Sequence, residues 1–250
     1  MSADLRAKLR AGTPAIGGWL GTGSVLVADA VASCGFDWVT IDMEHGTAGV
    51  EDAAGIFAAI QHRGSAAMVR LPSADPYLAR RLLDAGADGL IVPVVEDAEA
   101  FHQFAQHQLY PPAGRRGVGL ARGNLWGDTF QDTFNNFQPV LVAQIETKKG
   151  AVNADAIAAL DEIDALFIGP YDLSADLGVA GKLTDPALTD ALAMVKAASA
   201  KHGKAYGGHQ VDPDPMALKR MIEGGFRFIA YSTDIIAMRS VFAAIRNVKS

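Results

Sequence analysis

The chain has 250 residues, half of them apolar, and a formal net charge of −6 at pH 7. It contains no basic run, which excludes the electrostatic footprint of a nucleic-acid-binding protein. No apolar stretch approaches the roughly 18 to 20 residues that span a membrane, and the first residues lack the apolar core of a signal peptide. The single cysteine, Cys34, precludes an internal disulfide and suits a reducing compartment. We therefore expect a cytoplasmic protein with neither nucleic acid nor membrane as a partner.

Short apolar runs alternate with amphipathic helical segments along the whole chain. Runs of this length, bounded by turn residues, are typical of buried strands. The predicted strands cover residues 16–20, 38–44, 67–71, 89–95, 140–146, 166–172, 204–209 and 227–232. Predicted helices cover residues 25–33, 50–62, 76–85, 98–109, 215–223 and 235–248. The glycines at expected helix ends, where left-handed caps are common, are Gly35, Gly64, Gly86, Gly203 and Gly225.

This alternation predicts a single domain over residues 1–250 with the fold of a (β/α)8 TIM barrel. A doubly wound parallel sheet is the alternative. It would need a G-x-G-x-x-G turn after the first strand, and the glycines between residues 17 and 23 do not have that spacing. The segment 110–122 breaks the rhythm, because it is too long and too rich in glycine, proline and arginine for a simple connector. We expect it to fold over a site or to reach a neighbouring subunit.

The active site of a TIM barrel lies at the C-terminal ends of its strands. The residues with useful chemistry at these predicted ends are Trp19, Glu44, His45, Arg70, Glu146, Asp172 and His209. Glu146 and Asp172 end two successive predicted strands, where buried charges are costly and would repel each other. A divalent cation between the two carboxylates would relieve both costs. Their structural alternatives are helix N-caps or partners of internal arginines.

The other candidates also have structural alternatives. His45, beside Glu44, is either an acid–base residue or a histidine satisfied in the core. Arg70 either belongs to the site or only pairs with a carboxylate there, and Trp19 either lines the pocket or only packs. Asp84 lies near a predicted helix end, where a carboxylate is normally solvated, although a buried one can orient a catalytic histidine.

Several blocks of sequence give the chain a resemblance to a known family. They are Phe36-Asp-Trp-Val-Thr-Ile-Asp-Met-Glu-His45, Val69-Arg70, Tyr110-Pro-Pro-Ala-Gly with Arg116-Gly-Val-Gly, Gln144-Ile-Glu146-Thr, and Phe167-Ile-Gly-Pro-Tyr-Asp-Leu-Ser-Ala-Asp-Leu-Gly178. In this order they cover nearly the whole chain. With them the chain resembles the HpcH/HpaI aldolases, class II pyruvate aldolases that include the 4-hydroxy-2-oxoheptanedioate and 2-keto-3-deoxy-sugar acid aldolases.

The resemblance implies a (β/α)8 barrel whose last helix is exchanged between subunits of a homo-oligomer, often a hexamer built as a trimer of dimers. It implies that Glu146 and Asp172 bind Mg²⁺, Mn²⁺ or Co²⁺. It also implies that His45, oriented by Asp84, is the acid–base residue and that Arg70 stabilises an enolate. The residues expected at the substrate are Trp19, Gln144, Gly169, Pro170, Tyr171 and, near the aldehyde, Arg122.

Three positions depart from the family pattern. Tyr171 stands where a small residue is usual, so its side chain must lie outside the pocket. Arg122 lies in an altered run, Ala121-Arg-Gly-Asn-Leu-Trp126, which weakens the basis for its role. Gly208-His209 replaces a more apolar strand end, which alters the pocket.

The expected activity is cleavage or formation of 4-hydroxy-2-oxo acids from an aldehyde and the enolate of pyruvate or hydroxypyruvate. A Schiff-base aldolase would need an interior lysine, whereas Lys148 and Lys149 lie outside the apolar run of their strand. Two other classes stay open: a related lyase of CoA esters, of the citrate lyase β type, and a non-catalytic metabolite-binding barrel. The sequence determines neither the aldehyde, the stereochemistry, the preferred metal nor the preferred donor.

Overall fold

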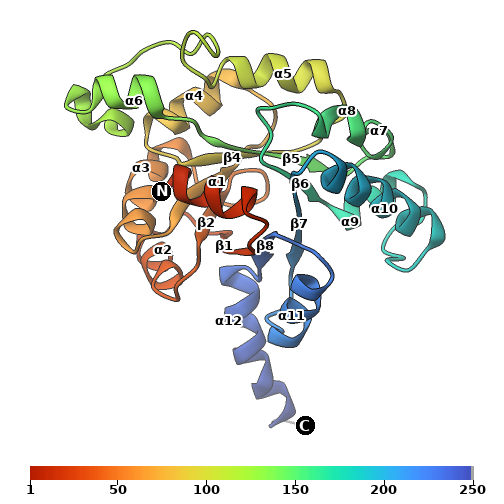
Figure 1. The fold of residues 1–250 in the computed structure, drawn as a ribbon. Coiled ribbons are helices and arrows are strands. Elements are labelled where there is room, and N and C mark those ends of the chain that lie inside the picture. Colours follow the sequence, from red (N-terminus) through yellow and green to blue (C-terminus); the bar gives the residue numbers. More distant parts are fainter. Residues whose placement is uncertain (249–250) are drawn as a thin grey trace.

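Eight parallel strands close into a barrel in sequence order within residues 1–248, the part of the chain that this computed structural model describes (Figure 1). The strands are β1 (Ala15–Leu20), β2 (Trp38–Asp42), β3 (Ala66–Arg70), β4 (Gly89–Val92), β5 (Val140–Ile145), β6 (Ala165–Ile168), β7 (Ala205–Gln210) and β8 (Phe228–Tyr231). Each strand pairs with the next, and β8 pairs with β1. The predicted TIM barrel is confirmed; the last two residues of the predicted domain, 249 and 250, lie outside the described part.

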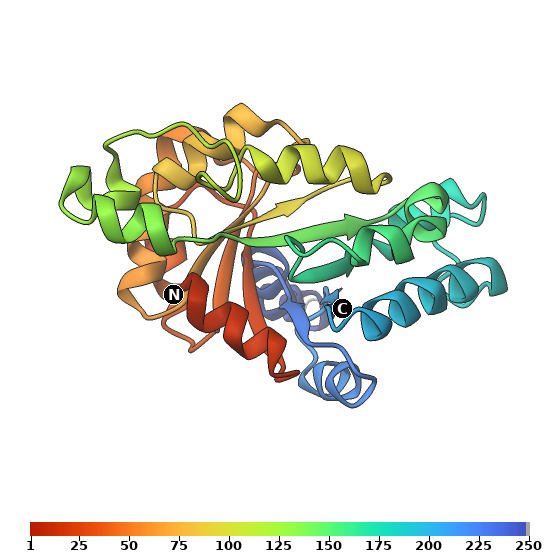
Figure 2. The same cartoon turned by 45° about the horizontal axis from the view of Figure 1, so that its top comes forward.

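Helices connect the strands, and most of them surround the barrel (Figure 2). They are α1 (Ser2–Arg10), α2 (Val25–Ala32), α3 (Val50–His62), α4 (Pro76–Asp84), α5 (Ala98–Gln106), η1 (Arg122–Gly127), α6 (Phe130–Asn136), α7 (Lys148–Val152), α8 (Ala154–Ala158), α9 (Pro170–Asp176), α10 (Pro186–Lys201), α11 (Pro215–Glu223), α12 (Asp234–Phe242) and η2 (Ala243–Asn247). All five glycines predicted at helix ends have positive φ angles. Within residues 1–248, none of these helices is both long and apolar enough to cross a membrane.

Alternate residues of each strand point into the barrel, because a strand repeats every two residues. The inner core contains Trp38 of β2 and Phe228 of β8, whose rings stack with centroids 4.2 Å apart. Gly17 of β1 leaves room for this pair, since a Cβ at Gly17 would lie 2.1 Å from the indole of Trp38. A second core, between the strands and the helices, contains outward residues such as Ile41 and Leu141.

The inward positions change from apolar to polar toward the C-terminal ends of the strands. In β2, steps of two residues lead from Trp38 through Thr40 to Asp42, and in β3 one such step leads from Met68 to Arg70. Asp42 and Arg70 are also paired in the parallel register of the two strands. The register of the barrel therefore brings a carboxylate and a guanidinium together at the rim.

Helix α1 closes the opposite, N-terminal end of the barrel. Its Leu5 and Leu9 are buried in the inner core. Its Arg6 lies 2.8 Å from Asp164, the residue immediately before β6. The predicted elements do not include this helix. Because α1 covers the N-terminal end, a ligand must reach the barrel interior from the end at which the strands finish.

The chain after β8 departs from the barrel. Helix α12 extends away from the body of the protein (Figure 1). The predicted helix at 235–248 is divided, because α12 ends at Phe242 and the short helix η2 follows. The large apolar side chains exposed on these two helices are Ile235, Met238, Val241, Phe242 and Ile245.

Three predicted strands extend too far at their C-terminal ends. The ranges 38–44, 89–95 and 166–172 correspond to β2, which ends at Asp42, β4, which ends at Val92, and β6, which ends at Ile168. Asp172 consequently lies in the first turn of α9 and not at the end of a strand. The physical reason is Pro170, whose fixed φ suits the first position of a helix and ends the strand pairing.

Candidate active site

Glu146 follows β5 directly and is buried, with 5% of its surface exposed. Its Oε1 accepts a hydrogen bond from the backbone N–H of Val94 at 2.7 Å, and its Oε2 accepts one from the side chain of Gln144. A Cβ at Gly169 would lie 2.7 Å from Oε2, so only glycine fits against this carboxylate. Burial raises the pKa of Glu146 above its ordinary value in spite of the two hydrogen bonds, and the charge of Asp172 raises it further. The positive charge around Glu146 therefore does not offset the cost of burying its negative charge.

The start of α9 forms the other side of the site. Gly169 precedes the helix, Pro170 is its first residue, and Tyr171 and Asp172 complete the first turn. The N–H groups of a first turn have no partner within their helix. Tyr171 is 58% exposed, so most of its side chain lies in solvent, as its place in the motif predicts. Asp172 is exposed at the helix N-terminus, where its negative charge is favourable.

Arg70 is fixed between two carboxylates. Its Nε and Nη2 donate to Asp42 at 2.9 and 2.6 Å, and its Nη1 lies 2.8 Å from Oε2 of Glu44. Burial alone would raise the pKa of Asp42, but the hydrogen bonds and charge of Arg70 outweigh it and hold that pKa below its usual value. For Glu44 the balance is reversed: burial raises its pKa more than Arg70 lowers it, and the charge of Glu146 adds to the rise. One guanidinium thus fully compensates only one of these carboxylates.

Aromatic rings form the wall beside Arg70. The indole N–H of Trp19 donates to Asp42 at 3.2 Å, and the guanidinium carbon of Arg70 lies 4.9 Å from the centre of the Trp19 ring. The same indole stacks on His209 and on Phe167, with centroids 4.9 and 5.9 Å away. Trp19 therefore lines the site as predicted, and it also packs.

A pocket of about 110 Å³ opens between these groups. It is lined by Trp19, Arg70, Gln144, Phe167, Ile168, Gly169, Pro170, Tyr171, Asp172, His209 and Val211. Such a volume holds several water molecules or one small acid. The pocket thus collects most of the residues that the sequence placed at the metal and the substrate, with Glu146 behind Gln144 and Gly169.

His45 does not line this pocket. Its side chain is 69% exposed, and its Nε2 lies 3.9 Å from Oε2 of Glu44. Its backbone N–H donates to Asp42 at 3.1 Å, so the main chain is anchored to the same carboxylate that holds Arg70. The imidazole is free to meet a group that projects from the pocket.

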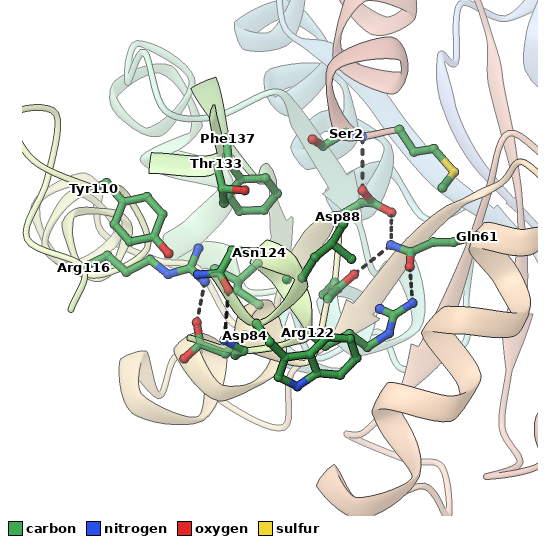
Figure 3. A pocket seen from close by; sticks show the side chains of 18 residues that line it. Ser2, Gln61, Asp84, Asp88, Tyr110, Arg116, Arg122, Asn124, Thr133 and Phe137 are labelled. Atoms are coloured by element: carbon green, nitrogen blue, oxygen red, sulfur yellow. Dashed lines mark hydrogen bonds and ion pairs between the residues drawn. The ribbon is translucent and has the colours of Figure 1, made fainter. Parts of the chain in front are cut away.

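Asp84 and Arg122 line a different and larger cavity, of about 370 Å³ (Figure 3). Asp84 is the last residue of α4, which runs back toward the N-terminal ends of the strands, and its Oδ1 accepts a hydrogen bond from Arg116 at 2.7 Å. Arg122 donates to Gln61 at 2.8 Å. Within one chain neither residue reaches His45, so their predicted roles there require a second copy of the chain and stay predictions.

The segment that breaks the strand–helix rhythm builds this larger cavity. Its residues Tyr110, Arg116, Ala121 and Arg122 line the cavity, together with residues 123–126, 133 and 137 and residues from α3 and α4. None of the segment lines the 110 Å³ pocket. Its two predicted roles, to fold over a site or to reach a neighbouring subunit, stay predictions.

Phe167 is a residue of the site to which the sequence assigned no role, whereas Asp42 was expected to point into a polar part of the rim. A signal for both exists in the period of two. Counting from the apolar Trp38 predicts that Asp42 points inward, and counting back from Gly169 predicts the same of Phe167. The alternation is hard to use from sequence because strands of a parallel barrel are buried on both faces.

The donor atoms of the site fit a divalent cation. Glu146 and Asp172 supply the hard oxygen ligands that such ions prefer. Glu44, whose Oε2 lies 2.8 Å from Nη1 of Arg70, adds a further carboxylate nearby. Among residues 1–248, no group of three or more His, Cys, Asp and Glu side chains converges as in a closed metal site. A shell with two protein ligands leaves most positions for substrate and water.

The fold and the site together indicate the class of protein. A guanidinium fixed beside two carboxylates, at the C-terminal end of a TIM barrel, is typical of an enzyme active site. The family model described as HpcH/HpaI aldolase/citrate lyase matches residues 16–240. The chain belongs to this family.

Known relatives agree over almost the entire length. A 4-hydroxy-2-oxo-heptane-1,7-dioate aldolase of Salmonella paratyphi C is 39% identical over 242 residues, which cover 94% of this chain and 89% of the relative. A hydroxypyruvate/pyruvate aldolase of Roseobacter denitrificans is 33% identical and covers 92% and 90%. The crystal structure of an HpcH/HpaI aldolase/citrate lyase family protein from Burkholderia cenocepacia superposes with a TM-score of 0.91 at 34% identity, over 99% of both chains. The chain is thus a carbon–carbon lyase of the aldolase type, from a family that generally depends on a divalent metal.

Proposed function

We propose that this enzyme cleaves or forms 4-hydroxy-2-oxo acids by way of the enolate of pyruvate or hydroxypyruvate and an aldehyde. The observation that carries the proposal is the position of Arg70, held by Asp42 at the wall of a pocket that Glu146 and Asp172 flank. The names of the relatives support the same reaction class.

Glu146 and Asp172 would hold the cation, which we take to be Mg²⁺, Mn²⁺ or Co²⁺. When bound, such an ion supplies a Lewis acid for the keto group of a 2-oxo acid. The N–H groups of Tyr171 and Asp172, free at the start of α9, would receive the substrate carboxylate. Gln144 keeps the Glu146 carboxylate in place through its hydrogen bond to Oε2.

Arg70 would stabilise the negative charge that forms on the keto oxygen. In the cleavage direction the bond between C3 and C4 breaks, its electron pair moves into the enolate, and the aldehyde leaves. A guanidinium already fixed by Asp42 need not reorganise as the charge develops, which is the condition under which such stabilisation is large.

His45 would move the proton. It takes the proton of the 4-hydroxyl during cleavage and returns a proton to C3 of the enolate, which yields the free 2-oxo acid. An imidazole suits both steps because its ordinary pKa lies close to neutral pH. Its exposed imidazole beside Glu44 supports this role.

The central test measures pyruvate released from a 4-hydroxy-2-oxo acid, coupled to lactate dehydrogenase. We expect release to stop in EDTA and to return on addition of Mg²⁺, Mn²⁺ or Co²⁺. Activity that persists after complete chelation would contradict the proposal. A His45→Ala variant that still binds Mn²⁺ but has lost turnover would exclude a non-catalytic metabolite-binding barrel. Binding and cleavage of a CoA ester in place of the oxo acid would instead support the CoA-lyase alternative.

We also propose that the enzyme is a cytoplasmic homo-oligomer, a hexamer built as a trimer of dimers, in which α12 packs on a neighbouring copy. The exposed apolar side chains of α12 support the exchange, and so does the distance of Asp84 and Arg122 from their predicted partners. Light scattering tests the mass. Co-refolding Asp84→Asn with Glu146→Gln tests the shared site, because mixed oligomers regain activity only if each copy completes the site of another.

A further inference from the structure

His209 is a polar residue in a wall that is otherwise aromatic and aliphatic. It lies two residues beyond Gly207 on the inner side of β7, and its ring stacks on Trp19 with an angle of 29° between the planes. It lines the same 110 Å³ pocket as Arg70, Phe167 and Val211. Stacking alone does not require a histidine at this position, because phenylalanine would serve equally well.

The hydrogen bonding of the ring fixes its tautomer. Nε2 lies 3.0 Å from the backbone carbonyl of Ser232. A carbonyl oxygen only accepts, so Nε2 must carry the hydrogen and donate it. Burial lowers the pKa of His209 and the charge of Arg70 lowers it further, against the opposing effect of the Ser232 bond. In the neutral ring Nδ1 is therefore a hydrogen-bond acceptor.

Among the described residues, Nδ1 has no hydrogen-bond partner, and the atom is not fully buried. It is thus accessible at the pocket that receives the 2-oxo acid. If the carboxylate and keto oxygens of that acid lie toward Asp172 and Arg70, the remaining substituent is on C3. The stack on Trp19, which itself lies against Arg70, holds the His209 ring in the pocket that also contains Arg70 and Asp172. We take this ring to face the C3 substituent.

We propose that His209 is a specificity-determining residue whose Nδ1 accepts a hydrogen bond from a hydroxyl group on C3 of the donor, so that 3-hydroxy-2-oxo acids of the hydroxypyruvate type are favoured over pyruvate. The inference rests on the proposed aldolase function and names the donor class for it. Pyruvate presents a methyl group there and offers Nδ1 no hydrogen to accept, so it gains no such hydrogen bond.

The test compares hydroxypyruvate, pyruvate and 3-fluoropyruvate as donors to one aldehyde, with Mg²⁺ or Mn²⁺ present. Fluoropyruvate carries a small polar substituent on C3 but no hydrogen-bond donor. His209→Phe keeps the stack on Trp19 and removes the acceptor, whereas His209→Asn keeps an acceptor atom close to the position of Nδ1. Thermal unfolding of both variants checks that they fold.

We expect His209→Phe to lower the ratio of kcat/KM for hydroxypyruvate over pyruvate by roughly 3- to 10-fold, the size of one neutral hydrogen bond, with a smaller loss in His209→Asn. The ratio for fluoropyruvate over pyruvate should stay within about twofold. An unchanged hydroxypyruvate ratio in His209→Phe, or an equal fall for fluoropyruvate, would overturn the proposal. If His209→Phe does not fold, His209→Leu, which likewise has no acceptor in its side chain, takes its place: a fall in the hydroxypyruvate ratio supports the proposal and an unchanged ratio overturns it. A wild-type enzyme that uses none of the three donors would show instead that the proposed function itself is wrong.

Discussion

The two ends of the barrel both bury carboxylates but treat them differently. At the N-terminal end, Asp37, Asp88 and Asp164 precede β2, β4 and β6, and both oxygens of each accept a hydrogen bond or ion pair. At the C-terminal end, Asp42 and Glu44 share one guanidinium, that of Arg70, and burial raises the pKa values of Glu44 and Glu146. Carboxylates whose charge is compensated stabilise a fold, whereas crowded carboxylates with raised pKa values mark a functional site. The contrast therefore separates the stabilising end of the molecule from the reactive one.

The largest expected effect comes from removing a ligand at the C-terminal end. Glu146→Gln keeps the size and the acceptor toward Val94 but removes the charge that would hold the cation. We expect kcat to fall by roughly 10³-fold or more, because the charge that forms on the keto oxygen loses its strongest counter-charge. Retro-aldol assays at saturating Mn²⁺ measure the loss, and unfolding in EDTA should show stability unchanged or increased.

Arg70→Lys tests the second element of the reactive end. Lysine retains the charge but not the fork that binds both oxygens of Asp42. We expect kcat to fall by roughly 10²-fold, with a smaller change in KM, because the lost interaction forms with the developing enolate. Arg63→Lys is the matched control: its fork binds Asp29 in the same way on an exposed surface, and activity should not change. If Arg63→Lys lowered kcat as much as Arg70→Lys, the assignment of Arg70 to the reactive end would be wrong.

Asp164→Asn addresses the stabilising end. Arg6 would lose its charge partner at a site where the aspartate side chain is 2% exposed. We expect the free energy of unfolding to fall by about 2 kcal/mol, less than for a fully buried pair because Arg6 can reach water. Urea unfolding measures this loss, and kcat per folded molecule should remain that of the wild type. A large loss of kcat without a loss of stability would reverse the assignment of the two ends.

The pH dependence of stability gives the smallest expected effect. Glu44 and Glu146 bind protons more tightly when folded than when unfolded, since their folded pKa values are raised. Their contribution to stability in EDTA should therefore be greatest below the ordinary value of 4.5 and fall as the pH rises through the folded values. Denaturant unfolding between pH 4 and pH 8 tests this slope. Glu146→Gln or added Mn²⁺ should flatten it, and a slope unchanged in Glu146→Gln would show that this carboxylate is not its source.

Some parts of the site were predictable because they depend on local pattern. The apolar run before Glu146 shows that this carboxylate follows a buried strand. The motif around Asp172 shows that Asp172 follows the next strand along the chain. The tautomer of His209 was not predictable, because it depends on a carbonyl 23 residues away at the end of the neighbouring β8. The partners of Arg70 likewise follow from the register between β2 and β3, which no single run of sequence contains.

The sequence by itself determined that the chain is a TIM barrel, and it determined which residue types occur where the strands end. Periodicity, glycine caps and short motifs are local properties, and they survive without knowledge of the neighbours. Only the tertiary structure decided that Asp84 and Arg122 lie at the other end of the molecule, because α4 runs antiparallel to the strands before it ends. Only barrel closure, which pairs β8 with β1, brings Trp19 against His209 and makes a pocket from residues far apart in the chain.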